Sequence, residues 1–145
     1  MAITTAMCTS FKTELLGGLH DLDTDSLKVA LIKVSPAGTY GAASTNYSNI
    51  TGNSDEASGT GYTAGGAVLD SPTITESGTT AYVDFADEVF STATISATGC
   101  MIYNTANANA AIAVFDFGGT ITATAGDFTI VFPANDASNA VVRIG

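Results

Sequence analysis

The sequence is poor in the residues on which most enzymatic and ionic chemistry depends. It has no tryptophan, one histidine and two cysteines, and only four of its 145 residues are lysine or arginine. Four cations against fourteen acidic residues exclude the clustered positive charge that nucleic acids and anionic membrane surfaces require. The longest apolar run, AAIAVF, is far shorter than the roughly 18 residues of a membrane-spanning helix. We therefore expect no nucleic-acid partner and no membrane partner.

The cysteines and the first residues are typical of a protein made in a reducing compartment. The opening MAITTAMCTS lacks the basic and apolar regions of a secretory signal, so we expect production in a cytoplasm. Cys8 and Cys100 are expected to be buried free thiols, with a disulfide between them as the alternative. Because no CxxC pair or Cys/His cluster is present, we expect no metal and no cofactor.

β-prone segments make up much of the remaining sequence. From Gly99 onward, four strand-length segments follow one another: GCMIYN, NAAIAVFDFGG, DFTIVFP and NAVVRIG. Phe128, Ile130 and Phe132 alternate with less apolar residues, so these three side chains are predicted to face the core, together with Phe115. Earlier strands are predicted at LKVALIKV, AVLDSPTI, TTAYVDF and EVFSTATI. The strand LKVALIKV is apolar on both faces and is expected to be buried on both.

A short helix is predicted near the start of the chain. Phe11, Leu15 and Leu19 fall on one helical face, which Leu16 widens, and Gly17-Gly18 is expected to end the helix. Seven or eight strands at roughly ten-residue spacing are typical of an antiparallel sandwich, jelly roll or barrel. We predict a single, mainly β domain over residues 1–145, an antiparallel β-sandwich or jelly-roll-like fold with one short N-terminal helix.

Two segments are predicted to contact other molecules. Residues 1–9 form an extended arm, of which Ala2 to Met7 are expected to be ordered by a neighbouring subunit or by the larger assembly that the protein binds. Residues 35–66 form a long loop rich in Gly, Asn and Ser, with a short hairpin expected around Tyr47 and Ile50. Loops of this length are usually functional. The candidate contact residues come from both segments and are Ala2, Ile3, Thr4, Thr5, Ala6, Tyr40, Tyr47, Ile50 and Tyr62.

Three patterns that resemble reactive or ligand-binding motifs are incomplete. Asp21, Asp23 and Asp25 begin a calcium loop, but the glycine and glutamate that complete one are missing, which favours a solvated turn with Asx-type bonds. The glycines of SGTGYTAGGAVL precede a β-prone run instead of the helix that a phosphate loop needs. His20 is expected on the surface, with no nucleophile beside it. We therefore predict no catalytic residue and no enzymatic activity.

Several blocks that span nearly the whole chain carry a family resemblance. They are MAITTAMCTSFKTELLGGLHDL, SGTGYTAGGAVL, DFADEVFSTATISATGCMIYN, AVFDFGG, TATAGDFTIVFP and NAVVRIG. Together they resemble a family of small structural proteins encoded among the head genes of tailed bacteriophages, many of them marine or cyanobacterial. The resemblance implies a virion protein, assembled in the host cytoplasm, that decorates and cements the exterior of the capsid. Its implied partners are the major capsid protein and copies of itself, with a homotrimer favoured and a dimer possible.

Two other functions stay open from the residues alone. A tail-, neck- or fibre-associated virion protein would contact a host receptor through residues 35–66. A host-side β domain with carbohydrate or adhesive binding is the third hypothesis. Copy number in the virion separates the first two, because a shell protein is abundant and a tail protein is not.

Overall fold

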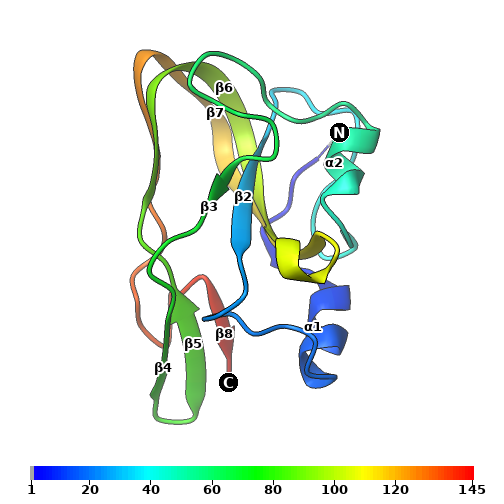
Figure 1. Ribbon diagram of the computed structural model, residues 1–145, viewed down its shortest axis with the longest axis vertical. Helices are drawn as coiled ribbons and strands as arrows, with labels where there is room; N and C mark the ends of the chain where they lie inside the picture. Colours follow the sequence, from blue (N-terminus) through cyan, green and yellow to red (C-terminus); the bar gives the residue numbers. More distant parts are fainter. Residues whose placement is uncertain (1) are drawn as a thin grey trace.

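The computed structural model describes residues 2–145, and Met1 lies outside the described residues. The described chain is mainly β, with eight strands in two antiparallel sheets and two short helices (Figure 1). The larger sheet has the order β1-β7-β6-β2-β3 and the smaller one β4-β5-β8, and they do not close into a barrel. The elements are β1 (Ala6–Met7), α1 (Thr9–Leu16), β2 (Leu27–Ile32), α2 (Ser48–Gly52), β3 (Ala67–Val68), β4 (Thr73–Ser77), β5 (Thr80–Asp84), β6 (Glu88–Asn104), β7 (Ala110–Ile130) and β8 (Val142–Ile144), with a 3-10 turn at Thr105–Asn107.

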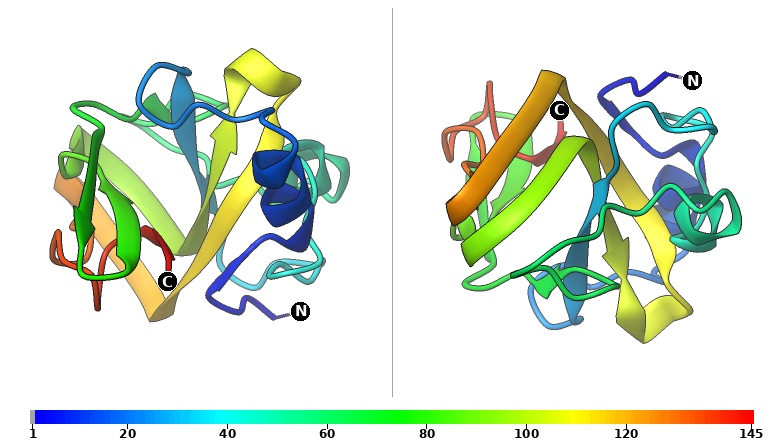
Figure 2. Two further views of the ribbon diagram at one scale, coloured as in Figure 1. Left: turned by 90° about the horizontal axis from the view of Figure 1, so that it is seen from below. Right: turned by 90° about the horizontal axis from the view of Figure 1, so that it is seen from above.

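A long hairpin of β6 and β7 dominates the larger sheet. The sequence predicted two separate strands where β6 lies and two where β7 lies, and this was wrong. Each is one continuous strand, of 17 residues in β6 and 21 residues in β7. Shifts of register absorb extra residues within the pairing, so the strands bend instead of stopping. β7 changes direction sharply in both views of Figure 2. Gly118 lies within the register shift between Asp116 and Ile121, and its φ of 79° is a backbone conformation that other residues rarely take.

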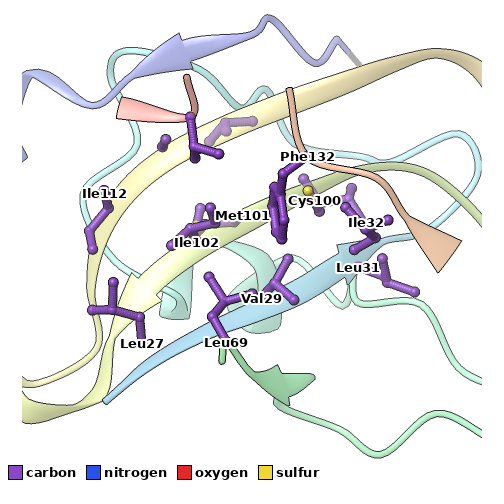
Figure 3. Packing of buried hydrophobic residues seen from close by; sticks show 14 of the residues in the cluster. Leu27, Val29, Leu31, Ile32, Leu69, Cys100, Met101, Ile102, Ile112 and Phe132 are labelled. Atoms are coloured by element: carbon purple, nitrogen blue, oxygen red, sulfur yellow. The ribbon is translucent and has the colours of Figure 1, made fainter. Parts of the chain in front are cut away.

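The core lies between β2, β6, β7 and the segments that cover them. β2 is buried on both faces, as its apolar pattern predicted. Figure 3 shows Val29 of β2 beside Met101 and Ile102 of β6, and the register pairs Val29 with Ile102. The predicted alternation at the end of β7 is confirmed, since Phe128, Ile130 and Phe132 are buried and Thr129 and Val131 are exposed. Phe115, by contrast, is only partly buried.

The helix α1 buries less of its apolar face than the sequence predicted. Phe11 is fully buried and Leu15 partly so, but Leu16 is 91% exposed and Leu19 is 50% exposed. The helix ends at Gly17, as expected. A second helix, α2, was not predicted at all. No helix of residues 2–145 is long and apolar enough to cross a membrane.

Both cysteines are buried free thiols, so the disulfide alternative is wrong. Burial, with the Glu14 charge as a smaller cause, raises the pKa of Cys8 to about 11. Burial alone raises the pKa of Cys100 to about 12. Because a thiol reacts as the thiolate, both cysteines are inert packing residues at neutral pH.

Candidate functional site

Residues 35–66, which we call the loop platform, lie against the edge of the larger sheet. The hairpin expected around Tyr47 and Ile50 does not form, because the chain turns into α2 there. Isolated bridges join the platform to the sheet, from Glu56 to Ile32 and from Thr60 to Thr94. Figure 1 shows α2 and its flanking segments at the upper right, away from β4, β5 and β8. The platform is therefore an ordered part of the fold with its own short helix.

Asp55 organises the first half of the platform. Its side chain is fully buried, and one carboxylate oxygen accepts a hydrogen bond from the Ala37 N–H at 2.9 Å and lies 3.1 Å from Nζ of Lys33. The other oxygen accepts from the Gly38 N–H at 2.8 Å and from the Tyr40 hydroxyl at 2.6 Å. Burial opposes ionisation, but these donors outweigh it and hold the pKa of Asp55 well below its usual range. The buried charge is thus fully paired.

Glu56 organises the second half in the same way. Its oxygens accept hydrogen bonds from the hydroxyls of Tyr47 at 2.6 Å and Tyr62 at 2.7 Å, and from the Gly65 N–H at 2.6 Å. Tyr47 also stacks on Tyr103 of β6, with ring centroids 4.5 Å apart. Burial, together with the hydrogen bond to Glu56, raises the pKa of Tyr47 and of Tyr62, so both hydroxyls remain donors at neutral pH.

The glycines that superficially matched a phosphate loop have a packing role instead. Gly66 has φ of 80°, and a Cβ there would collide with the carbonyl of Val29 in β2. Gly59 has φ of 153°, and a Cβ there would collide with the carbonyl of Thr94 in β6. These positions need glycine because the platform backbone passes directly against the strands.

The surface of the platform carries no exposed charge. Asp55 and Glu56 are the only charged residues between positions 35 and 66, and neither is exposed. Every exposed platform residue is Ser, Thr, Ala, Gly or Asn. A hollow of about 450 Å³ opens between α2 and the preceding segment, and its polar lining includes Thr39, Ser44, Ser48, Asn49 and Asn53. In a chain of net charge −10, this surface is an uncharged region.

Two of the predicted contact residues are unable to reach a partner. Tyr40 is 1% exposed and Ile50 is fully buried, because both fill the space beneath the platform. Tyr47 and Tyr62 are partly buried, and their hydroxyls are already bonded to Glu56. These four residues were predicted to contact a partner because they lie in a long loop, and loops of this length are usually functional. Their contacts instead hold the platform on the sheet.

The described arm residues pair with their own chain, which the sequence did not predict. Strand β1 pairs with β7, Ala6 opposite Val114. The Thr4 N–H donates to the Tyr40 carbonyl at 2.9 Å, and the Tyr40 N–H donates to the Ala2 carbonyl at 2.9 Å. Ala2, Thr4 and Thr5 remain exposed, whereas Ile3 and Ala6 are partly buried. Contact of the arm with a partner stays a prediction.

The remaining candidate groups are engaged in local structure. His20 is buried, not exposed as expected: its Nε2 lies 2.6 Å from Glu14 and its Nδ1 lies 3.0 Å from the Asn104 amide nitrogen. The acidic segment forms a turn in which the Asp21 N–H donates to the Asp25 carboxylate at 3.0 Å; this bond reaches back four residues and is not an Asx-type bond. Within residues 2–145, no group of three or more His, Cys, Asp or Glu side chains is placed to hold a metal ion.

Comparison of the chain with protein-family models, with curated proteins and with solved structures finds no significant match. The description of the site therefore depends on the chain alone. Asp55 and Glu56, the two residues that organise the platform, were not among the predicted site residues. A signal was present, since these are the only two ionisable acids in a segment that also contains three tyrosines.

Proposed function

We propose that the protein is a non-enzymatic structural protein of a virion that decorates the exterior of a capsid shell and cements it. The observation that carries this proposal is the uncharged, preorganised surface of the loop platform. A binding loop that is already fixed loses little conformational entropy when it docks. Asp55 and Glu56 fix the platform through seven hydrogen bonds and ion pairs described above, so it can bury its surface without first folding.

The charge distribution supports a protein partner. The platform offers Ser, Thr, Ala, Gly and Asn, so affinity would come from shape-matched burial and neutral hydrogen bonds. The acidic remainder of the chain repels nucleic acid and anionic lipid, which is compatible with an outer layer around a packaged genome. The sequence resemblance to phage head proteins points to the major capsid protein as this partner. We also propose the sandwich- or jelly-roll-like arrangement, which the two antiparallel sheets support only in part.

One observation favours a second candidate function. The hollow beside α2 is polar and uncharged, with Ser, Thr and Asn in its lining, and such groups can bind sugar hydroxyls. A tail-, neck- or fibre-associated virion protein that binds a host receptor would use this hollow. The host-side carbohydrate-binding domain would use it in the same way.

Quantification of the protein in purified virions tests the proposal. We expect a copy number that is a simple fraction of that of the major capsid protein, because decoration follows the shell's symmetry. Particles that lack the protein should still assemble but should break at a lower temperature. Moderate salt should not remove it, because screening acts mainly on exposed charges. A copy number of only a few per particle would instead support the tail or fibre function.

A further inference from the structure

A second surface, remote from the platform, lies between the end of α1 and the smaller sheet. A groove of about 320 Å³ opens there. Its lining includes the large aliphatic residues Leu15, Leu22, Ile74, Val83, Val142 and Ile144. Ile74 and Ile144 are 52% and 54% exposed. Figure 1 shows α1 and the strands β4, β5 and β8 at the lower end of the molecule, which the left view of Figure 2 faces.

Aliphatic side chains also project beside this groove. Leu16 is 91% exposed and Leu19 is 50% exposed, while their chain neighbours Leu15, Gly18 and His20 line the groove. Single exposed apolar residues are ordinary, but a cluster of them around an apolar depression is typical of a protein interface. The surface therefore combines a protruding leucine and a hollow that suits one.

The groove is preformed. His20 in its wall lies 2.6 Å from Glu14 of α1 through Nε2 and 3.0 Å from Asn104 of β6 through Nδ1. The Asn104 amide also donates to Asp25 at 2.6 Å. Since the amide nitrogen is a donor, Nδ1 accepts and the Nε2–H donates to Glu14. These bonds hold the α1 wall of the groove at a fixed position relative to β6 of the larger sheet.

We propose that Leu16 of one copy of the chain occupies the groove of a second copy, in a two-fold dimer. A two-fold interface uses one patch on both subunits, so it requires a surface that is complementary to itself. A protruding leucine beside an aliphatic groove meets that requirement. When two copies are related by a two-fold rotation, the leucine of each copy can enter the groove of the other.

The charges at this end also match those of a second copy. Lys12 lies one helical turn before Leu16, so the two side chains share a face of α1. Among residues 2–145, Lys12 has no ion-pair partner. Asp21 is exposed in the lining of the groove. In the proposed dimer, Lys12 of one copy would face Asp21 of the partner's groove, and the same pair would form a second time across the two-fold axis.

The oligomeric state of the full chain, measured by sedimentation equilibrium, tests this dimer. We expect the wild-type protein to dimerise at micromolar concentrations, and Leu16→Gln to weaken the dimer by roughly tenfold or more, as loss of a central apolar anchor does. Val131→Gln is the matched control, because Val131 is 71% exposed and is not part of the groove lining, and it should leave the dimer intact. A monomeric wild type, a trimer, or equal dissociation by both variants would contradict the proposal.

A charge exchange tests the orientation of the two copies. Lys12→Glu and Asp21→Lys should each weaken the dimer, and the double variant should restore it toward the wild-type affinity. Single variants without effect, or a double variant as weak as the singles, would overturn the two-fold arrangement.

The biological role of the dimer, though not its existence, rests on the proposed function: two linked platforms would hold a shell more tightly than one. The two proposals fail separately. If the chain dimerises through Leu16 but does not bind capsids, the dimer proposal stands and the decoration proposal fails. If the wild type is monomeric and binds capsids as well as Leu16→Gln does, only the dimer proposal fails.

Discussion

The loop platform and the opposite end of the molecule, where the groove lies, differ in which side chains they bury and which they expose. In the loop platform, the charged groups are hidden and the apolar residues Tyr40 and Ile50 are buried, so the exposed surface is small, polar and uncharged. At the groove end, four large aliphatic side chains stay half or more exposed: Leu16, Leu19, Ile74 and Ile144. The platform is completed by contacts within the chain, whereas the groove end leaves apolar contacts unmade.

This difference separates residues that matter for folding from residues that matter for association. Substitutions inside the platform should change the free energy of unfolding, because its side chains are buried and hydrogen-bonded. Substitutions at the groove end should leave that free energy nearly unchanged and should act on self-association. The predictions below test the contrast, from the largest expected effect on stability to the smallest.

Asp55→Ala should give the largest effect, a loss of about 3–5 kcal/mol in the free energy of unfolding, because it leaves buried donors and Lys33 without their partner. Chemical denaturation monitored by circular dichroism measures this loss. Asp70→Ala is the control: Asp70 is exposed, and its removal should change stability by less than about 0.5 kcal/mol. Equal effects from both substitutions would show that Asp55 does not organise the platform.

Glu56→Gln should cost about 1–3 kcal/mol, less than the loss of Asp55. Glutamine removes the charge and keeps one acceptor oxygen for the Tyr62 hydroxyl and the Gly65 N–H, but its amide nitrogen replaces the oxygen that accepts from the Tyr47 hydroxyl, which must turn to accept instead. The same denaturation experiment measures the change. Near-UV circular dichroism should also report a looser Tyr47–Tyr103 stack, and an unchanged signal would argue against a role for Glu56 in holding it.

The contribution of Asp55 should also depend on pH. The folded-state pKa of Asp55 is lowered below the unfolded value of about 3.9, so its stabilisation is complete above that pH and is lost as the pH falls further. The stability difference between the wild type and Asp55→Asn should therefore be largest near neutral pH and should shrink below about pH 4. Urea titrations of both proteins across this range give the difference. A constant difference would mean that the charge of Asp55 is not responsible.

Leu16→Gln should give the smallest change in the stability of the isolated chain, under about 0.5 kcal/mol, because the side chain is already 91% exposed. The measurement belongs at high dilution, where self-association does not contribute. A loss comparable to that of Glu56→Gln would show that Leu16 packs within its own chain, and the contrast between the two ends would fail.

Periodicity in the sequence predicted the regular parts of this fold well. The alternation at Phe128, Ile130 and Phe132 and the apolar strand β2 were assigned to the core correctly, because side-chain burial follows strand geometry directly. The strand boundaries were wrong in β6 and β7, because bulges let a strand continue through residues that look like breaks. Local pattern does not encode such register shifts.

The platform was harder to predict, because its order comes from long-range contacts. Tyr40 and Ile50 were predicted to contact a partner because they lie in a long loop, but both are buried, and the Tyr40 hydroxyl donates to Asp55, a fully buried charge that hydropathy places outside. The arm was similarly assigned to a partner, although β7 of its own chain binds it. In both cases the missing information was which distant segment supplies the hydrogen-bond partners.

The central claim is that the uncharged platform is the surface that binds another protein. Binding of the purified chain to undecorated capsids, measured by co-sedimentation, tests it with two double variants that add the same charge at exposed positions. Thr39→Glu with Ser48→Glu places the charges on the platform, and Thr73→Glu with Thr75→Glu places them on β4. We predict that the platform variant loses binding by roughly tenfold or more while the β4 variant binds as the wild type does. Full binding by the platform variant, or equal loss in both, would contradict the claim.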